Sequence, residues 1–386
     1  MREVAILSSV RTAGAKANKG GFRDTRPDTL AAAVIKGALD KAKVEAKDLD
    51  DVILGCAFPE AEQGMNVARV AAGMAGVPWE VPAMTINRFC SSGLQAIAIG
   101  ADRIRVGDCE VVVAGGVESM SMVPMGGNKY SLNADALEKM PNMYTPMGIT
   151  SELVATRFEI TREQQDELAL RSNLRAAAAV KDGKFKDEII PVTTKVYEAG
   201  GVKSITVDND EGPRGETTLE SLAKLKPAFD SQGRSTAGNS SQVTDGAAVS
   251  VLMDAERAKK EGRDILGYFR GFAVAGVPPE IMGIGPVPAI RKLLKKMKLE
   301  IKDIDLFEIN EAFASQATYC ARELGIDSEK LNVNGGAIAL GHPLGATGAK
   351  LTATLLHEMK RRKARYGIVS MCIGGGMGAA GLFERA

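Results

Sequence analysis

The sequence lacks the features that mark several large classes of protein. Its 49 basic and 48 acidic side chains leave a net charge of +1, so no excess charge favours nucleic acid or a membrane surface. No apolar run is long enough to span a bilayer or to form a signal-peptide core. The 5 cysteines are odd in number and too few for a disulfide framework, which favours a reducing compartment. We therefore expect a cytoplasmic protein with no membrane span and no nucleic-acid partner.

Common metal and cofactor motifs are also missing. The 5 cysteines and 2 histidines show no CxxC or HxxxH pairing, so a zinc site is not expected. No GxGxxG follows a first strand, and GxxxxGK[ST] is absent, which argues against dinucleotide and P-loop sites. We predict no metal and no cofactor.

Glycine, in contrast, is abundant at 42 of 386 residues. In both end regions short β-branched runs alternate with helical patterns, which predicts an α/β fold with mostly buried sheets. From about 119 to 242 that alternation stops, and the segment is rich in Met, Gly, Pro and Asn. It carries one strong helical pattern at 162–183 and otherwise predicts irregular structure or short strands. We interpret this segment as an inserted lid.

An internal repeat organises the rest of the chain. Residues 35–55 align without a gap with residues 290–310, and both read as a helix, a turn and a strand. Later parts also recur in order: a loop that enters a helix, then a strand that ends in glycines. Chance similarity of two Lys-rich amphipathic helices is the alternative. We favour duplication, which would let equivalent helix N-termini from the two halves converge on one site. The predicted division is a first half of 1–118 plus 243–265, a lid of 119–242, and a second half of 266–386.

Cys90 is the first candidate for chemistry. It lies in NRFCSSG, where a predicted strand ends and a helix begins with small residues. The unpaired amides and dipole of a helix N-terminus are expected to lower the thiol pKa and favour the nucleophilic thiolate. A buried thiol that only fills space is the alternative. We read Cys56, Cys109 and Cys320 as packing residues.

The two histidines occupy different contexts. His342 lies in a Gly-rich loop that enters a helix, in ALGHPLGATG, and could take a proton from a thiol near neutral pH. A loop histidine that caps backbone carbonyls is the alternative. His357 lies in the last turns of a charged helix, and we interpret it as solvated.

Two further positions stand at strand ends. Cys372 precedes Gly374 in SMCIGGGMG, where backbone amides could form an oxyanion hole, although a strand-terminal turn with a buried cysteine is also plausible. Asn310 ends the strand LFEIN before a predicted helix, where capping alone would explain it.

Taken together, NRFCSSGLQA, GGVESMS, NEAFA, GHPLGATGA and CIGGGMG resemble the signature segments of the thiolase family, in the family's order and over nearly the whole chain. The resemblance implies that Cys90 is acylated, His342 activates it, and Cys372 is a second acid/base. It also implies that Asn310 holds a water for one oxyanion hole and that the amides of Cys90 and Gly374 form another.

The resemblance further implies a thiolase fold of two duplicated α-β-α-β-α layered halves with an inserted loop domain, and a homodimer or homotetramer. Acyl-CoA and CoA would be the substrates. The implied CoA- and substrate-binding residues are Arg214, Phe229, Ala237, Ser241, Phe313 and Met147.

One departure bears on the substrate. Thiolases specialised for acetoacetyl-CoA carry a histidine where this chain has Pro146, before Met147. The chain is therefore more similar to degradative 3-ketoacyl-CoA thiolases (acetyl-CoA acyltransferases). An acetyl-CoA acetyltransferase specific for acetoacetyl-CoA and a non-catalytic acyl-binding protein of the same fold remain alternatives. Ketoacyl synthases pair their cysteine with two histidines, which fits poorly because only His342 is suitably placed.

Overall fold

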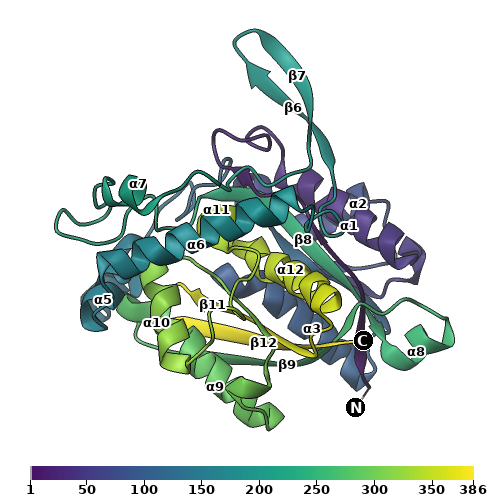
Figure 1. Cartoon of the computed structure of the whole chain (residues 1–386). Coiled ribbons are helices and arrows are strands. Elements are labelled where there is room, and N and C mark those ends of the chain that lie inside the picture. The colour runs from purple at the N-terminus through teal and green to yellow at the C-terminus, as the bar shows by residue number, and fades with distance from the viewer. Residues whose placement is uncertain (1) are drawn as a thin grey trace.

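The computed structural model describes residues 2–386, and most of its strands form one large sheet with helices on both faces (Figure 1). The strands are β1 (Val4–Arg11), β2 (Ala15–Lys16), β3 (Asp51–Gly55), β4 (Ala83–Ile86), β5 (Val111–Glu118), β6 (Val192–Glu198), β7 (Gly201–Val207), β8 (Thr244–Asp254), β9 (Gly267–Gly276), β10 (Leu306–Ile309), β11 (Tyr366–Ile373) and β12 (Met377–Arg385). The α-helices are α1 (Pro27–Ala42), α2 (Val67–Met74), α3 (Ser92–Val106), α4 (Ala134–Lys139), α5 (Met147–Arg157), α6 (Arg162–Lys181), α7 (Leu219–Ala223), α8 (Ala255–Lys260), α9 (Pro286–Met297), α10 (Ala314–Leu324), α11 (Ala337–Leu340) and α12 (Thr347–Arg362).

The strand order of the large sheet is symmetric. It runs β10-β11-β12-β9-β1-β8-β5-β3-β4, with β1 and β9 antiparallel at the centre. On either side follow antiparallel β8 and β12, then antiparallel β5 and β11, then parallel β3 and β10. A single parallel bridge from Phe307 to Leu331 takes the position that corresponds to β4. This order confirms the two similar halves predicted from the sequence.

The repeat has the same local geometry in both copies. α1 and α9 are each followed by a lysine in the left-handed region, Lys43 (φ 54°) and Lys298 (φ 56°), which are 255 residues apart. The same spacing separates the starts of β3 and β10, of the 3-10 turns η3 (89–91) and η7 (344–346), and of α3 and α12. It also separates β5 from β11 at both ends. Chance similarity of two Lys-rich helices would not give the same spacing of 255 residues in all these elements.

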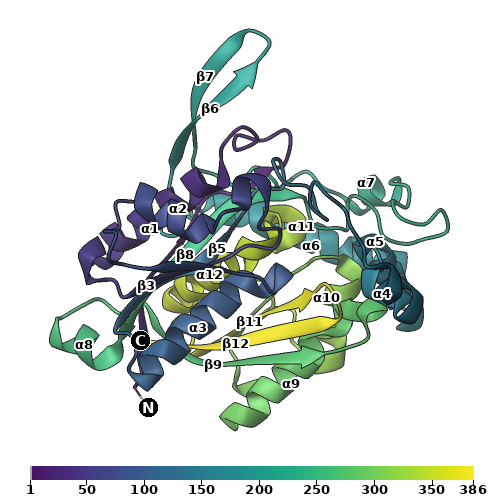
Figure 2. The same ribbon diagram turned by 180° about the vertical axis from the view of Figure 1, so that it is seen from behind.

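The core is divided into layers by the alternation of side chains along the strands. In β3, Val52 and Leu54 pack with residues of α1 and α2, whereas Ile53 packs with residues of α3 and α12. Residues of α9 and α10 pack against the outer side of the second half. Figure 2 shows α3 and α12 in the middle of the molecule, with α1 and α2 beyond one half and α9 beyond the other. The result is the predicted α-β-α-β-α order.

The first turns of α3 and α12 touch at two glycines. A Cβ on Gly93 would lie 2.9 Å from the amide nitrogen of Ala349, and a Cβ on Gly348 would lie 2.5 Å from that of Leu94. Backbone can approach this closely only where no side chain intervenes. Because Cys90 lies just before α3 and the His342 loop leads into α12, this contact brings the predicted site residues of the two halves together.

The segment 119–242 contains more helix than the sequence predicts. α6 confirms the helix at 162–183, but the prediction of irregular structure for 147–157 is wrong because α5 forms there. β-branched Ile149, Thr150 and Val154 weaken its helical signal, and burial of Val154 and Ala155 stabilises it instead. β6 and β7 form a hairpin that projects away from the body (Figures 1 and 2). No helix among residues 2–386 is long and apolar enough to cross a membrane.

Candidate active site

Cys90 lies in η3, the corner between β4 and α3. Neighbouring side chains lock this corner: Asn87 Oδ1 accepts the amide of Phe89 (2.8 Å), and Ser92 Oγ accepts the amide of Arg88 (2.8 Å) and donates to the carbonyl of Phe89 (2.7 Å). Phe89 has φ 42°, a left-handed conformation that is uncommon for an aromatic residue. The thiol is therefore presented from a strained strand-to-helix turn.

The environment of Cys90 keeps the thiol protonated. Burial raises the pKa of the Cys90 thiol to about 12. A hydrogen bond from the Gly374 amide lowers this pKa, whereas the nearby Glu118 carboxyl raises it. The prediction that the helix terminus lowers this pKa in the free protein is therefore wrong, because removal of water from the sulfur outweighs the amides. The contact with the Gly374 amide is nevertheless the one expected of an oxyanion-hole donor.

His342 enters the site from the second half. Its amide donates to the Gln242 carbonyl (3.2 Å) and lies 3.1 Å from Thr244 Oγ1, which ties the loop to the start of β8. Its Nδ1 lies 2.6 Å from Thr347 Oγ1 in the first turn of α12, and this bond orients the ring. Leu344, two residues after His342, packs in one apolar cluster with Cys90. Burial lowers the pKa of His342 to about 3, so the imidazole is neutral and able to accept a proton.

Asn310 lies beside His342. Its Nδ2 is 3.3 Å from His342 Nε2, and its Oδ1 is buried with no hydrogen-bond partner. The interpretation of Asn310 as a helix cap is wrong, because α10 begins four residues later with Phe313 at its N-cap. A buried amide oxygen without a partner is suited to hold a water or a substrate group.

Cys372 approaches from the end of β11. It is 1% exposed and packs in one apolar cluster with Phe313 and Met147. Burial raises its pKa well above the ordinary value, and a charge on Cys90 would raise it further. β11, which carries Cys372, contacts the turn η3, which carries Cys90. Gly375 (φ 78°) and Gly376 (φ 85°) form the turn after Gly374. The structure thus brings both candidate cysteines to the same place.

The predicted CoA-site residues divide into two groups. Phe229 and Phe313 form an edge-to-face pair with centroids 5.8 Å apart, and Phe229 covers Gly148 next to Met147. The amide of Ser241 donates to the carbonyl of Ala312, and the preceding residue, Ser240, forms a β-bridge with Phe313. Arg214 and Ala237 are exposed on loops on either side of α7.

Sequence reasoning missed two residues and misread a third. Glu118 ends β5 fully buried and accepts the amides of Ala57 (2.8 Å) and Gly345 (2.7 Å), so it joins the Cys90 side to η7. The sequence feature that could have identified Glu118 is an acidic residue at the end of an apolar strand. The second missed residue is Thr347, which could have been identified as a hydroxyl residue in the first helical turn after His342. The interpretation of His357 as solvated is wrong: it packs on β1 with Nε2 3.1 Å from the Ser9 carbonyl oxygen, and burial lowers its pKa.

The remaining cysteines behave as predicted, since Cys56, Cys109 and Cys320 are all buried. Within residues 2–386 no group of three or more His, Cys, Asp or Glu side chains is arranged to hold a metal ion. What the site offers is a thiol under an amide donor, a second thiol beside it, and a neutral imidazole next to an amide. Such a site suits covalent acyl transfer with two proton-transfer groups.

Comparison with known proteins agrees with this chemistry. Residues 4–256 match the model of the thiolase N-terminal domain, and residues 263–385 match that of the thiolase C-terminal domain. The chain belongs to the thiolase family, and it is an acyltransferase. Thiolases use CoA as a substrate and need no cofactor.

Comparison with full-length relatives shows to which thiolases the chain is similar. The chain is 54% identical to a 3-ketoacyl-CoA thiolase of Bacillus subtilis over the whole of both chains. It is 51% identical to the peroxisomal 3-ketoacyl-CoA thiolase 1 of Arabidopsis thaliana, over 99% of this chain and 88% of the relative. Two crystal structures cover 100% of this chain and 99% of their own: a Bacillus anthracis acetyl-CoA acetyltransferase (TM-score 0.92, 44% identity) and human mitochondrial 3-ketoacyl-CoA thiolase (TM-score 0.91, 40% identity).

Proposed function

We propose that this thiolase cleaves 3-ketoacyl-CoA with CoA, releasing acetyl-CoA and a shortened acyl-CoA, through an acyl group carried on Cys90. The same steps in reverse condense two acyl units. The observation that carries the proposal is the position of Cys90 under the Gly374 amide and beside Cys372, with the paired His342 and Asn310 entering from the other half. The relatives at 51 to 54% identity support the substrate class.

In the first half-reaction, His342 takes the proton of the Cys90 thiol, and the thiolate attacks the 3-keto carbon. A water on Asn310 Oδ1, with His342, stabilises the oxyanion; the unpartnered oxygen supports this role. The bond between C2 and C3 then breaks with its electron pair on C2, and the Cys372 thiol protonates that carbon to give acetyl-CoA. Acyl-Cys90 and the Cys372 thiolate remain.

In the second half-reaction, the Cys372 thiolate deprotonates an incoming CoA thiol, which attacks the carbonyl carbon of acyl-Cys90. The amides of Cys90 and Gly374 hold this second oxyanion. Collapse of the tetrahedral intermediate releases the shortened acyl-CoA, and the Cys90 thiolate recovers its proton from His342. The high pKa values of the two thiols in the free protein fit a mechanism in which each is deprotonated only within the reaction.

For binding of CoA we propose Phe229, Ala237, Ser241 and Phe313 along the pantetheine arm, with Met147 also in the substrate site. Support comes from the edge-to-face contact of Phe229 with Phe313, which packs in one apolar cluster with Cys372. Arg214 is proposed near the adenine and pyrophosphate end of CoA, which agrees with its exposed position. We propose the lid of 119–242 as the segment that covers this site, and the boundaries at 118, 243 and 266 as those of the two halves.

The oligomeric state and the cellular location of the protein are also proposals. A homodimer or homotetramer is supported by the short edge strand β4 and by the exposed apolar side chains near it, Met74 and Trp79. We propose a cytoplasmic location, whereas the names of relatives from Arabidopsis thaliana and Mus musculus place those proteins in peroxisomes and the human structural neighbour is mitochondrial. Light scattering of the purified chain and imaging of a tagged chain in its own cells test these two points.

The decisive test of the substrate is the rate of thiolysis across 3-ketoacyl-CoA chains from C4 to C16. With Pro146 ahead of Met147, we expect activity to extend beyond C4. Activity confined to C4 would instead favour an acetyl-CoA acetyltransferase, the activity for which the Bacillus anthracis structural neighbour is named. No thiolysis at any length by the folded protein would favour a non-catalytic acyl-binding protein.

A further inference from the structure

Lys350 is a buried lysine directly behind the His342 loop. It lies on α12 with 4% of its surface exposed, and its Nζ donates to the Gly341 carbonyl oxygen at 3.1 Å. Gly341 has φ 82°, and a Cβ there would lie 2.3 Å from Thr244 Oγ1, so the backbone conformation at this position is fixed. The carbonyl that Lys350 holds belongs to the peptide bond that leads into His342. One turn earlier on the same helix, Thr347 holds the ring of His342 by Nδ1.

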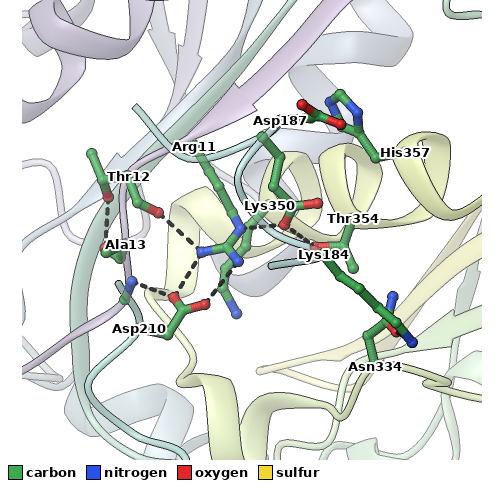
Figure 3. Close-up of polar contacts among 12 residues, drawn as sticks. Arg11, Thr12, Ala13, Lys184, Asp187, Asp210, Asn334, Lys350, Thr354 and His357 are labelled. Atoms are coloured by element: carbon green, nitrogen blue, oxygen red, sulfur yellow. Dashed lines mark hydrogen bonds and ion pairs between the residues drawn. The ribbon is translucent and has the colours of Figure 1, made fainter. Parts of the chain in front are cut away.

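Lys350 lies in the same buried region as an ionic cluster around Arg11, the Arg11 cluster (Figure 3). The Arg11 guanidinium donates to both oxygens of Asp210 (2.7 and 2.8 Å) and to Glu188 Oε1 (2.6 Å). Thr354 donates to the same Glu188 oxygen at 2.8 Å, while Glu188 Oε2 is buried without a partner. The charges that face Lys350 from other elements are thus Arg11 on β1, Glu188 and Asp210 on the loops at either end of the projecting hairpin, and Glu308 on β10.

A charge count shows why the lysine is needed there. Asp210 and Glu188 carry two negative charges against the single positive charge of Arg11. Burial and neighbouring carboxylates raise the pKa of Glu308 well above its ordinary value, which disfavours a further negative charge there. Burial and Arg11 lower the pKa of Lys350 to about 8, which leaves the ammonium as its main form at pH 7. Arg11, Asp210, Glu188 and Lys350 together are therefore neutral when Lys350 is protonated.

We propose that Lys350 is a positioning residue for His342: its ammonium, whose charge balances that of the Arg11 cluster, fixes the Gly341 carbonyl and so the direction in which the imidazole points at Cys90. This inference rests on the proposed role of His342 as the base. The ammonium also disfavours a second positive charge nearby. Burial, and after it Lys350, lower the pKa of His342, which keeps the imidazole free to accept the thiol proton.

The test compares Lys350→Met with Lys350→Arg and with Lys360→Met, a control at an exposed position of the same helix. Methionine fills most of the volume but leaves the Gly341 carbonyl without its donor. We expect kcat for thiolysis to fall by about tenfold or more in Lys350→Met, because a misdirected base lowers the rate, while KM for CoA changes by less than about twofold. Lys350→Arg, which retains a donor and a charge, should recover most of the rate, and Lys360→Met should match the parent protein.

A histidine-specific readout separates positioning from general loss of structure. The chain has only 2 histidines, so carbon-13-labelled histidine gives two ring signals, and His357→Gln assigns them. In Lys350→Met the His342 signal should change position and its pKa should rise, since a neighbouring cation is lost. If Lys350→Met folds poorly, the double variant Lys350→Met/Glu188→Gln removes one negative charge and restores neutrality. It should recover thermal stability without recovering kcat.

The inference is overturned if folded Lys350→Met keeps the parent kcat and the parent His342 signal, or if kcat of the double variant recovers together with its stability. His342→Asn distinguishes this failure from failure of the proposed function. Loss of thiolysis in His342→Asn with an unaffected Lys350→Met removes only the role of Lys350. Retention of thiolysis in His342→Asn removes the proposed base itself.

Discussion

The contact between α3 and α12 makes Gly348→Ala the most informative single substitution for the geometry of the site. The new Cβ would lie 2.5 Å from the backbone nitrogen of Leu94 and 2.6 Å from its Cβ. Neither atom is the end of a flexible side chain, so a helix must move. Ordinary van der Waals contact begins at 3.4 Å, so the first turns of α3 and α12 must separate by about 0.9 Å.

Two consequences follow from a shift of this size. Overpacking of a close contact costs about 1–3 kcal/mol of stability, only part of which is offset by the gain of about 0.5–1 kcal/mol for alanine over glycine in a helix. The shift also separates Cys90 from His342, since each precedes one of the two helices. A displacement near 1 Å at a reacting pair lowers the rate by about 10²-fold, so the loss in kcat should exceed the loss expected from stability alone.

The assay is the rate of thiolysis of acetoacetyl-CoA combined with urea unfolding. Gly73→Ala in α2 is the matched control, because its Cβ would meet only the Trp79 ring at 3.7 and 3.8 Å. The control should gain about 0.5–1 kcal/mol of stability with an unchanged rate. A Gly348→Ala protein that retains kcat within about threefold of the parent would refute the reasoning that this contact sets the distance between nucleophile and base.

Three further outcomes follow from the site. In steady-state kinetics, Asn310→Ala should lower kcat by about 10²–10³-fold with little change in KM, because Oδ1 no longer holds the water that stabilises the oxyanion. An unchanged kcat would exclude a role for that water. Cys372→Ser should still be acylated at Cys90 yet lose most carbon–carbon bond chemistry, and normal thiolysis would remove Cys372 from the mechanism. Lys350 has a pKa of about 8 in the folded chain against 10.5 in the unfolded chain, so between these values the unfolded chain holds more protons and this group's contribution to stability rises with pH. Urea unfolding of the parent relative to Lys350→Met should show that rise from pH 7 to roughly pH 9.5, and an equal difference at both pH values would contradict it.

Much of the fold could be predicted because duplication leaves a periodic record in the sequence. The alignment of 35–55 with 290–310 gave the register that α1 with β3 and α9 with β10 adopt. Helix α5 could not be predicted in the same way, because its residues prefer no helix on their own and are held by burial of Val154 and Ala155.

The candidate site was predicted by position but not by electrostatics. In the structure Cys90, His342 and Cys372 lie at the strand and helix ends where the sequence predicts them, because strands and helix termini of the two halves meet at fixed points; their catalytic roles stay predictions. The pKa of Cys90 depends on how completely other segments cover the sulfur, and no local pattern reports that. The same is true of Arg11 and Lys350, whose partners lie far away in the sequence.

The central claim is that Cys90 carries the acyl group. Peptide mass spectrometry after incubation with acetyl-CoA tests it directly. We predict an added acetyl group on the peptide that contains Cys90, lost again on addition of CoA and absent from Cys90→Ala. An unmodified Cys90 in active protein, or an equal acetyl adduct in Cys90→Ala, would contradict the account.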